Sequence, residues 1–199
     1  MAQTAARDAG AADMPATLTL DEQLAVFRRG RFLAMPIAGT IAWTLIGVAG
    51  AILPLVGAVW AIFIGTGFIF YLGLGVARVT GEDLLGKTRK GNLFDRIFLM
   101  GTIEAVLVYS IAIPFFLIEP TSLPLTVGIL AGLMWIPFSG MLGHWVGLFH
   151  SFTRTALIVA AWYLVPDGRF VAIPAIIVLV YLATIAILAG RPWEAAERA

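Results

Sequence analysis

Long uninterrupted runs of apolar residues dominate the chain from about residue 32 onward. Runs of about 18 or more apolar residues are typical of transmembrane helices and are too long for the apolar face of a soluble domain's helix. Pro54, Pro120 and a Pro-Asp-Gly turn at 166–168 mark three of the breaks between them, and these residues end helices or favour turns. The predicted spans are 32–53, 55–77, 96–118, 123–149, 152–165 and 170–189. We therefore predict an all-α fold, a polytopic membrane bundle of about six transmembrane helices within 32–190.

A short amphipathic helix is predicted ahead of the first span, in residues 18–31. Thr19 and Glu22 have the spacing of a capping box, in which each residue bonds the backbone of the other. Three arginines follow near its end, as expected for a helix lying at the cytoplasmic headgroup level. A simple N-terminal extension of the first span is the alternative.

Basic residues fall almost entirely on one side of the predicted membrane. If alternate loops are cytoplasmic, only Arg169 lies outside. The residues placed inside are Arg28, Arg29, Arg31, Arg78, Lys87, Arg89, Lys90, Arg96, Arg154, Arg191 and Arg198. This positive-inside bias predicts that both termini are cytoplasmic, including a disordered tail at 1–17 and a short tail at 191–199. The expected location is the inner membrane of a bacterium.

Composition supports this class and narrows the chemistry. The chain is 60% hydrophobic and 13% charged, whereas about a quarter of residues are charged in soluble domains. The lipid bilayer is therefore its main predicted partner, and a net charge of +1 gives no indication of nucleic-acid binding. The absence of cysteine excludes disulfides, thiolate metal sites and a cysteine nucleophile. We predict no catalytic residues, metal site or cofactor, and no enzymatic activity.

The basic loop after the second span contains a match to the phosphate-loop pattern at 81–88. That motif requires a strand before it and a helix after it, so that backbone amides surround the phosphates. A loop between two membrane helices cannot supply the strand, so we interpret the match as coincidence. The candidate role of Lys87, Arg89 and Lys90 is instead to attract anionic lipid headgroups.

Glu104 is the candidate functional residue within a span. It lies eight residues after Arg96, or about 12 Å along the helix, which places a carboxyl group within the hydrocarbon. Such residues normally face the bundle interior and have a partner. His144, in the span 123–149, is the candidate partner for a substrate or ion path, although an interhelical hydrogen bond with a structural role is the alternative. His150 and Arg154 are expected near the cytoplasmic face, where they snorkel or bind lipid phosphate.

The fourth predicted span, 123–149, is rich in glycine. Two GxxxG spacings, at 128/132 and 143/147, flank Pro137. Small residues allow close helix approach in lipid and proline can kink a helix. We interpret this span as the central, most tightly packed helix, with the glycine-containing span 55–77 as its packing partner; a dimer seam or hinge is the alternative.

Several short motifs resemble a family of small bacterial multi-pass proteins of unknown function. They are Arg28-Arg29-Gly30 with Gly39 and Trp43, Gly91-Asn92 with Glu104, and Trp135-Ile136-Pro137-Phe138 with Gly143. The resemblance extends from Phe27 to the end of the chain. Where that family tends to place an arginine before the aromatic residue, this chain has Met134. The resemblance implies the multi-pass topology and no activity.

Two functions fit the sequence. One is a small transporter or channel, with Glu104 and His144 lining a polar path in a monomer or homodimer. The other is an accessory or assembly subunit of a larger membrane complex, because no soluble domain or clustered site is apparent. A lipid-binding role of the basic loop is a third hypothesis.

Overall fold

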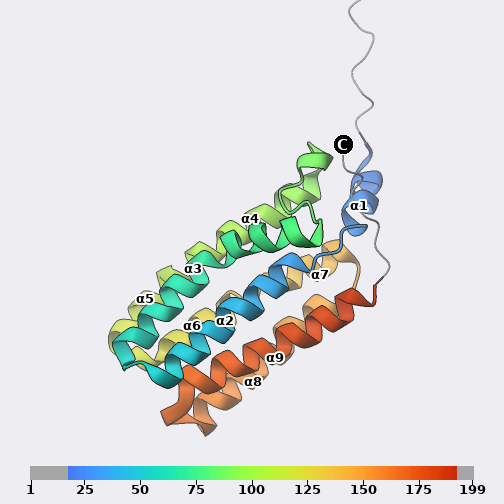
Figure 1. The fold of residues 1–199 in the computed structure, drawn as a ribbon. Coiled ribbons are helices and arrows are strands. Elements are labelled where there is room, and N and C mark those ends of the chain that lie inside the picture. Colours follow the sequence, from blue (N-terminus) through green and yellow to red (C-terminus); the bar gives the residue numbers. More distant parts are fainter. Residues whose placement is uncertain (1–17, 192–199) are drawn as a thin grey trace, which may run out of the picture.

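Helices account for all the regular secondary structure in the part of the chain that the computed structural model describes, residues 18–191 (Figure 1). The predicted tail at 1–17 and residues 192–199 of the predicted C-terminal tail lie outside this range. The all-α class is confirmed for the described residues, which contain no strand.

Nine α-helices lie within residues 18–191, joined in places by short 3₁₀ turns. They are α1 (Leu20–Arg28), α2 (Ala34–Ile52), α3 (Leu55–Thr80), α4 (Leu93–Leu107), α5 (Tyr109–Ile118), α6 (Leu123–Leu130), α7 (Trp135–Leu142), α8 (Val146–Leu164) and α9 (Arg169–Ala189). The α4–α5 pair and the α6–α7 pair each run as one long segment.

In the described part of the chain, five segments are long and apolar enough to cross a membrane: Ala34–Ile52, Leu55–Thr80, Leu93–Ile118, Pro120–Leu142 and Pro166–Ala189. The α8 helix has the same length as α2, 19 residues, but it is not among the five. It carries His150 and Arg154, which lower its apolar character.

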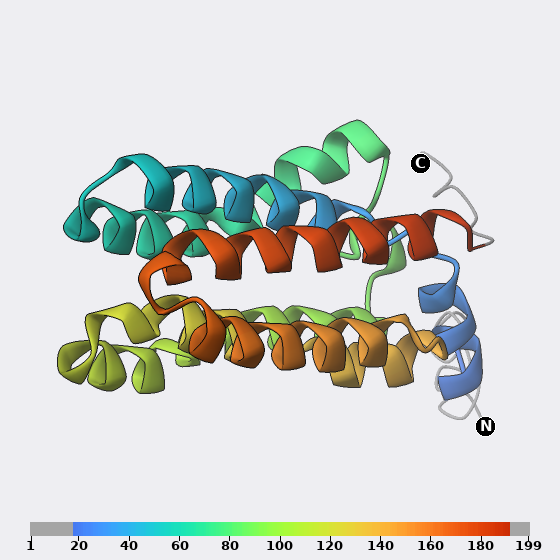
Figure 2. The ribbon, with the colours of Figure 1, turned by 90° about the horizontal axis from the view of Figure 1, so that it is seen from below.

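The long segments form two layers (Figure 2). One layer contains α3, α2 and α9, with α2 packed between the other two. The second contains α4–α5, α6–α7 and α8, and the layers also meet where α8 packs on α9. We call the end that contains α1 the proximal end. Residue 191 lies there too, because the Arg191 guanidinium donates to the backbone oxygens of Arg28 and Gly30.

Local sequence explains where the helices begin and end. The capping box is confirmed: the Thr19 hydroxyl accepts a bond from the Glu22 amide, and the Glu22 carboxylate accepts from the Thr19 amide at 2.7 Å. Pro54 separates α2 from α3, and Gly81 ends α3 in the left-handed region at φ 73°. Such a backbone conformation favours glycine, which has no Cβ to clash.

The fourth and fifth predicted spans have different boundaries in the structure. The predicted helix 123–149 is interrupted at 131–134 and ends at Leu142, because Gly143 adopts a left-handed conformation with φ 67°. The chain reverses there and α8 begins at Val146. The fifth predicted span, 152–165, is therefore too short, and residues assigned to the end of the fourth belong to α8.

The glycines of α6 and α8 are sites of close packing inside the chain, as the tight-packing interpretation predicted. A Cβ at Gly128 would lie 3.0 Å from the Ile158 side chain, and one at Gly147 would lie 2.8 Å from Ser139 Cβ. The predicted partnership with the second span is only a minor contact, between α3 and α6. The α3 helix packs mainly along α2, where a Cβ at Gly65 would lie 2.8 Å from Ile46.

The α1 helix is separate from α2 and packs on the proximal end of the second layer, against α4 and α7. Phe27 is fully buried there and contacts the rings of Phe32, Phe94 and Phe98. In the non-helical connection between α1 and α2, Phe32 has a left-handed φ of 58°. The alternative of a continuous N-terminal extension is thus wrong.

We expect a Gly147→Ala substitution to destabilise the protein by about 1–3 kcal/mol, because the new methyl group overpacks the contact between α7 and α8. Gly140→Ala is the matched control, since a Cβ at this exposed helical position meets no atom within 4 Å. Thermal unfolding in detergent micelles measures both. Equal stability of the two variants would contradict the close packing at Gly147.

Candidate functional site

A cavity of about 150 Å³ lies between the two layers. Its walls are mainly apolar and aromatic, with contributions from both layers. The polar lining residues are Thr66, Glu82, Thr102, Tyr109, Arg154 and Tyr181, besides the indole groups of Trp43 and Trp135. Within residues 18–191, Arg154 is the one Lys, Arg or His side chain in the lining.

Arg154 is buried at mid-depth in the bundle. It follows Val146, the first residue of α8, by eight positions, which corresponds to about 12 Å along a helix of 19 residues. Its side chain is 1% exposed. The same face of α8 carries His150 and Ile158, both fully buried, as expected for residues four apart on a helix.

Hydrogen bonds satisfy one part of the guanidinium. Arg154 Nη1 lies 3.3 Å from His150 Nε2 and 3.4 Å from the Tyr181 hydroxyl. Arginine donates and cannot accept, so His150 Nε2 is the acceptor and the imidazole proton lies on Nδ1. His150 Nδ1 donates this proton to Thr184 Oγ1, with 2.9 Å between the nitrogen and the oxygen. The Thr184 hydroxyl in turn donates to the Val180 backbone oxygen. The tautomer is thus assigned by the network.

The remaining guanidinium donors have no protein partner. Nε and Nη2 of Arg154 are buried without a hydrogen bond, and no carboxylate among residues 18–191 forms an ion pair with this side chain. The Glu82 carboxylate lines the same cavity, but it accepts bonds from the Leu33 amide at 3.0 and 3.2 Å.

Aromatic rings and glycines shape the space around Arg154. Its Cζ lies 5.6 Å from the Trp43 ring centre and 5.5 Å from that of Tyr181. Gly39 makes room for the Tyr181 ring, because a Cβ there would lie 2.5 Å from Tyr181 Cζ. Gly132 makes room for the arginine itself, since a Cβ would lie 3.0 Å from Arg154 Cδ.

The energetic balance of this arrangement is unfavourable without a further partner. A charged side chain at mid-membrane costs about 2.5–3.5 kcal/mol on insertion scales, and each unsatisfied buried donor adds about 1–3 kcal/mol. Cation–π contacts stabilise a desolvated guanidinium by about 2 kcal/mol each. The two hydrogen bonds of Nη1 are long, at 3.3 and 3.4 Å, and therefore weak. The free edge of Arg154 is therefore a site that favours an anionic or hydrogen-bond-accepting group.

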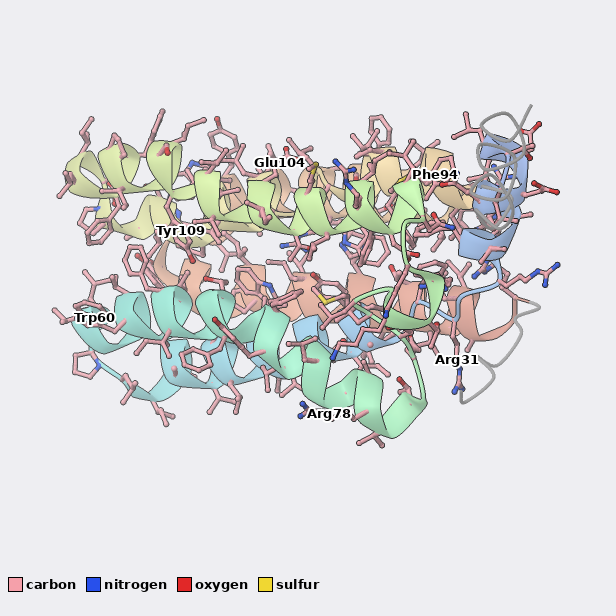
Figure 3. All side chains as sticks on the ribbon, turned by 90° about the horizontal axis from the view of Figure 1, so that it is seen from above. Arg31, Trp60, Arg78, Phe94, Glu104 and Tyr109 are labelled. Atoms are coloured by element: carbon pink, nitrogen blue, oxygen red, sulfur yellow. The ribbon has the colours of Figure 1, made fainter. Side chains whose placement is uncertain are left out.

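The residues that sequence patterns singled out lie elsewhere. Glu104 is exposed on the outward side of α4, whereas Tyr109 points toward the other layer (Figure 3). His144 lies in the turn before α8, where its Nδ1 accepts a bond from the Val146 amide at 3.2 Å. Neither Glu104 nor His144 lines the cavity. The expectation that Glu104 faces the interior is wrong, because α4 presents that position to the outside.

The basic loop is partly engaged in its own structure. Arg89 donates to both oxygens of Asp95, with Nε–Oδ2 at 3.0 Å and Nη2–Oδ1 at 2.8 Å. Lys87 and Lys90 are exposed, and their contact with lipid headgroups stays a prediction. Arg89 holds the loop against α4 rather than projecting from it.

In the segment that matches the phosphate-loop pattern, backbone amides donate to a carboxylate of the same loop. Asp83 accepts bonds from the Lys87 amide at 2.9 Å and from the Thr88 amide and hydroxyl, both at 2.6 Å. Partial burial raises the pKa of Asp83. The hydrogen bonds and the positive charge of Arg89 together lower it by more than burial raises it, so the pKa lies below its usual value. The amides that would surround a phosphate are thus already occupied.

Sequence reasoning missed Arg154 because the helix boundary was misplaced. With a span beginning at 152, Arg154 would lie at the membrane surface and snorkel; with α8 beginning at Val146, it lies at mid-depth and is buried. The expectation for His150 and Arg154 is therefore wrong. Glycine is common just past the end of a helix, but Gly143 is one of 21 glycines in the chain, so the sequence alone did not single it out.

Residues 18–191 form an all-helical fold with five segments of membrane-spanning length and apolarity, and a buried arginine lies in the lining of its interior cavity. The chain belongs to a family of unknown function, DUF7010, whose model matches residues 24–191. The resemblance to an uncharacterised family is thereby confirmed. No curated protein and no solved structure matches the chain.

We expect Arg154→Met, which keeps a similar volume, to leave the ligand-free protein at least as stable as the wild type. Replacing a buried charge by a packed apolar residue is often neutral or stabilising by about 1–4 kcal/mol. Ile158→Ala, one turn away on the same buried face, is the control and should lose about 2–5 kcal/mol. Thermal unfolding in micelles compares them. A loss in Arg154→Met as large as the control's would make Arg154 a structural residue.

Proposed function

We propose that this protein crosses a bacterial inner membrane six times, with both termini in the cytoplasm, and acts as a small transporter that binds an acidic small molecule in the cavity beside Arg154. The observation that carries the proposal is the free Nε and Nη2 edge of that buried guanidinium. A transporter needs a site inside the membrane that compensates its substrate for lost water, and a preformed donor edge supplies this.

The outer surface supports membrane insertion. Large apolar and aromatic side chains are exposed along the long helices, among them Trp60, Phe68, Ile118 and Tyr163. A soluble monomer rarely exposes contiguous apolar area of this kind. A bilayer covers such a belt without cost, because its hydrocarbon is as apolar as these side chains.

The arrangement of the ends supports six crossings. Residues 28–30 and residue 191 meet at the proximal end, so the chain between them crosses an even number of times. With five apolar segments, α8 is the sixth crossing. The apolar helices around it shield Arg154 from lipid, as is typical of charged residues in membrane bundles.

The sidedness follows from the charges. Arg31, Arg78 and the basic loop lie at the proximal end (Figure 3), and Arg169 lies at the other end, where its guanidinium donates to Thr121 Oγ1 at 2.6 Å. The positive-inside rule therefore places the proximal end in the cytoplasm.

The absence of native cysteine allows a clean test of this topology. We expect Lys90→Cys to be labelled by a membrane-impermeant maleimide only after the membrane is opened, and Asp167→Cys to be labelled in intact spheroplasts. Both positions are exposed in the structure, so access is set by the membrane. Labelling of both positions from the same side would contradict six crossings with cytoplasmic termini.

We expect native mass spectrometry of the protein, gently extracted from its host, to show a retained small acidic molecule that Arg154→Met loses. Arg96→Gln, which removes one exposed positive charge, should retain it. Heterologous chains at fixed stoichiometry, with no bound small molecule in either protein, would contradict the transporter proposal and favour an accessory subunit of a larger complex.

A further inference from the structure

The free edge of Arg154 has the geometry of a carboxylate-binding fork. Nε–H and the adjacent N–H of Nη2 are parallel donors on one side of a guanidinium, and they match the two oxygens of a carboxylate. The same edge of Arg89 binds Asp95 in this chain, with Nε–Oδ2 and Nη2–Oδ1 distances of 3.0 and 2.8 Å. In Arg154 this edge has no acceptor among residues 18–191, and both of its nitrogen atoms are buried, so a ligand in the cavity reaches them only when the side chains around Arg154 shift.

The charge of the cavity limits the ligand to one negative charge. Arg154 is the one cationic side chain that residues 18–191 contribute to the lining, and the Glu82 carboxylate in the same lining is bonded to the Leu33 amide. A monoanion matches the single positive charge of the guanidinium. The second charge of a dianion would have no cationic partner in the described lining, and an isolated buried charge is very unfavourable in a low-dielectric interior.

The rest of the cavity surface is mainly apolar, so the part of the ligand outside its charged group is expected to be apolar and small. Besides two tyrosines, the aromatic residues that the described chain contributes to the lining are Phe32, Trp43, Phe70, Phe98, Trp135 and Phe138. The cavity volume is about 150 Å³, and an apolar cavity of about that size accommodates benzene. A hydrophilic body would lose its hydration without replacement.

We propose that the ligand is a small monocarboxylate with a ring-sized apolar body, held by Nε and Nη2 of Arg154. This inference rests on the proposed binding site and names its substrate class. Trp43 and Tyr181 flank the guanidinium, so they are positioned to orient the fork and to exclude lipid and water from it.

Binding of labelled benzoate to the purified full chain in lipid nanodiscs tests the inference. We expect benzoate to bind at least about tenfold more tightly than benzamide, which lacks the charge, or formate, which lacks the body. Terephthalate, a dianion of similar width, should bind as weakly as benzamide. Arg154→Met should abolish benzoate binding, and Arg96→Gln should not change it.

A second variant tests binding of the apolar part of the ligand independently of its carboxylate. Ala105 lines the cavity from α4, so Ala105→Leu should fill part of it and weaken benzoate at least about tenfold while leaving formate unchanged. Equal loss of both ligands would overturn the assignment of the apolar body to this cavity.

The outcomes distinguish the substrate class from the proposed function. Arg154-dependent binding in which formate, terephthalate or benzamide matches benzoate would overturn the substrate class and leave a ligand site at Arg154. Tighter binding of laurate than of benzoate would overturn the size limit and make the ligand a fatty acid from the bilayer. Benzoate binding that survives Arg154→Met would overturn both proposals.

Discussion

A guanidinium at mid-depth of a bundle with apolar outer faces constrains everything packed around it. Arg154 cannot shed its proton as lysine can, so the surrounding helices must supply acceptors and ring faces. His150, Tyr181 and Thr184 form one side of that environment. Gly132 supplies the room that the arginine stem needs. Among residues 18–191 no acceptor bonds the other side of the guanidinium, and this asymmetry is the basis of the proposed ligand site.

The two ends of the bundle are built differently. Toward the end opposite the proximal end, α3 and α5 meet through Phe63, Tyr109 and Phe116, and the Thr66 and Tyr109 hydroxyls bond each other. At the proximal end, the backbone that joins α1 to α2 is held by Glu82 and Arg191. The left-handed conformation of Phe32, which costs about 1–2 kcal/mol for a non-glycine residue, persists because its ring packs among other aromatic rings.

Much of the fold was predictable because bilayer-length apolar runs carry a strong signal. Predicted spans 32–53, 55–77 and 170–189 correspond closely to α2, α3 and α9, since Pro54 and a Pro-Asp-Gly turn mark their ends. The reversal at Gly143 was missed because the chain contains 21 glycines, so one more does not mark a helix end. The site depends on that reversal. Trp43 and Tyr181 also lie far from Arg154 in the sequence, and pattern alone does not bring them together.

The most direct test of the buried fork is solid-state NMR of the protein in lipid bilayers, with ¹⁵N in its arginine side chains and benzoate carrying ¹³C in the carboxyl group. The account predicts dipolar coupling of the carboxyl carbon to one arginine, through Nε and Nη2, and the loss of that coupling in Arg154→Met. Coupling that persists in Arg154→Met, or bound benzoate with no arginine coupling, would contradict the claim that Arg154 is the anchor of an interior ligand site.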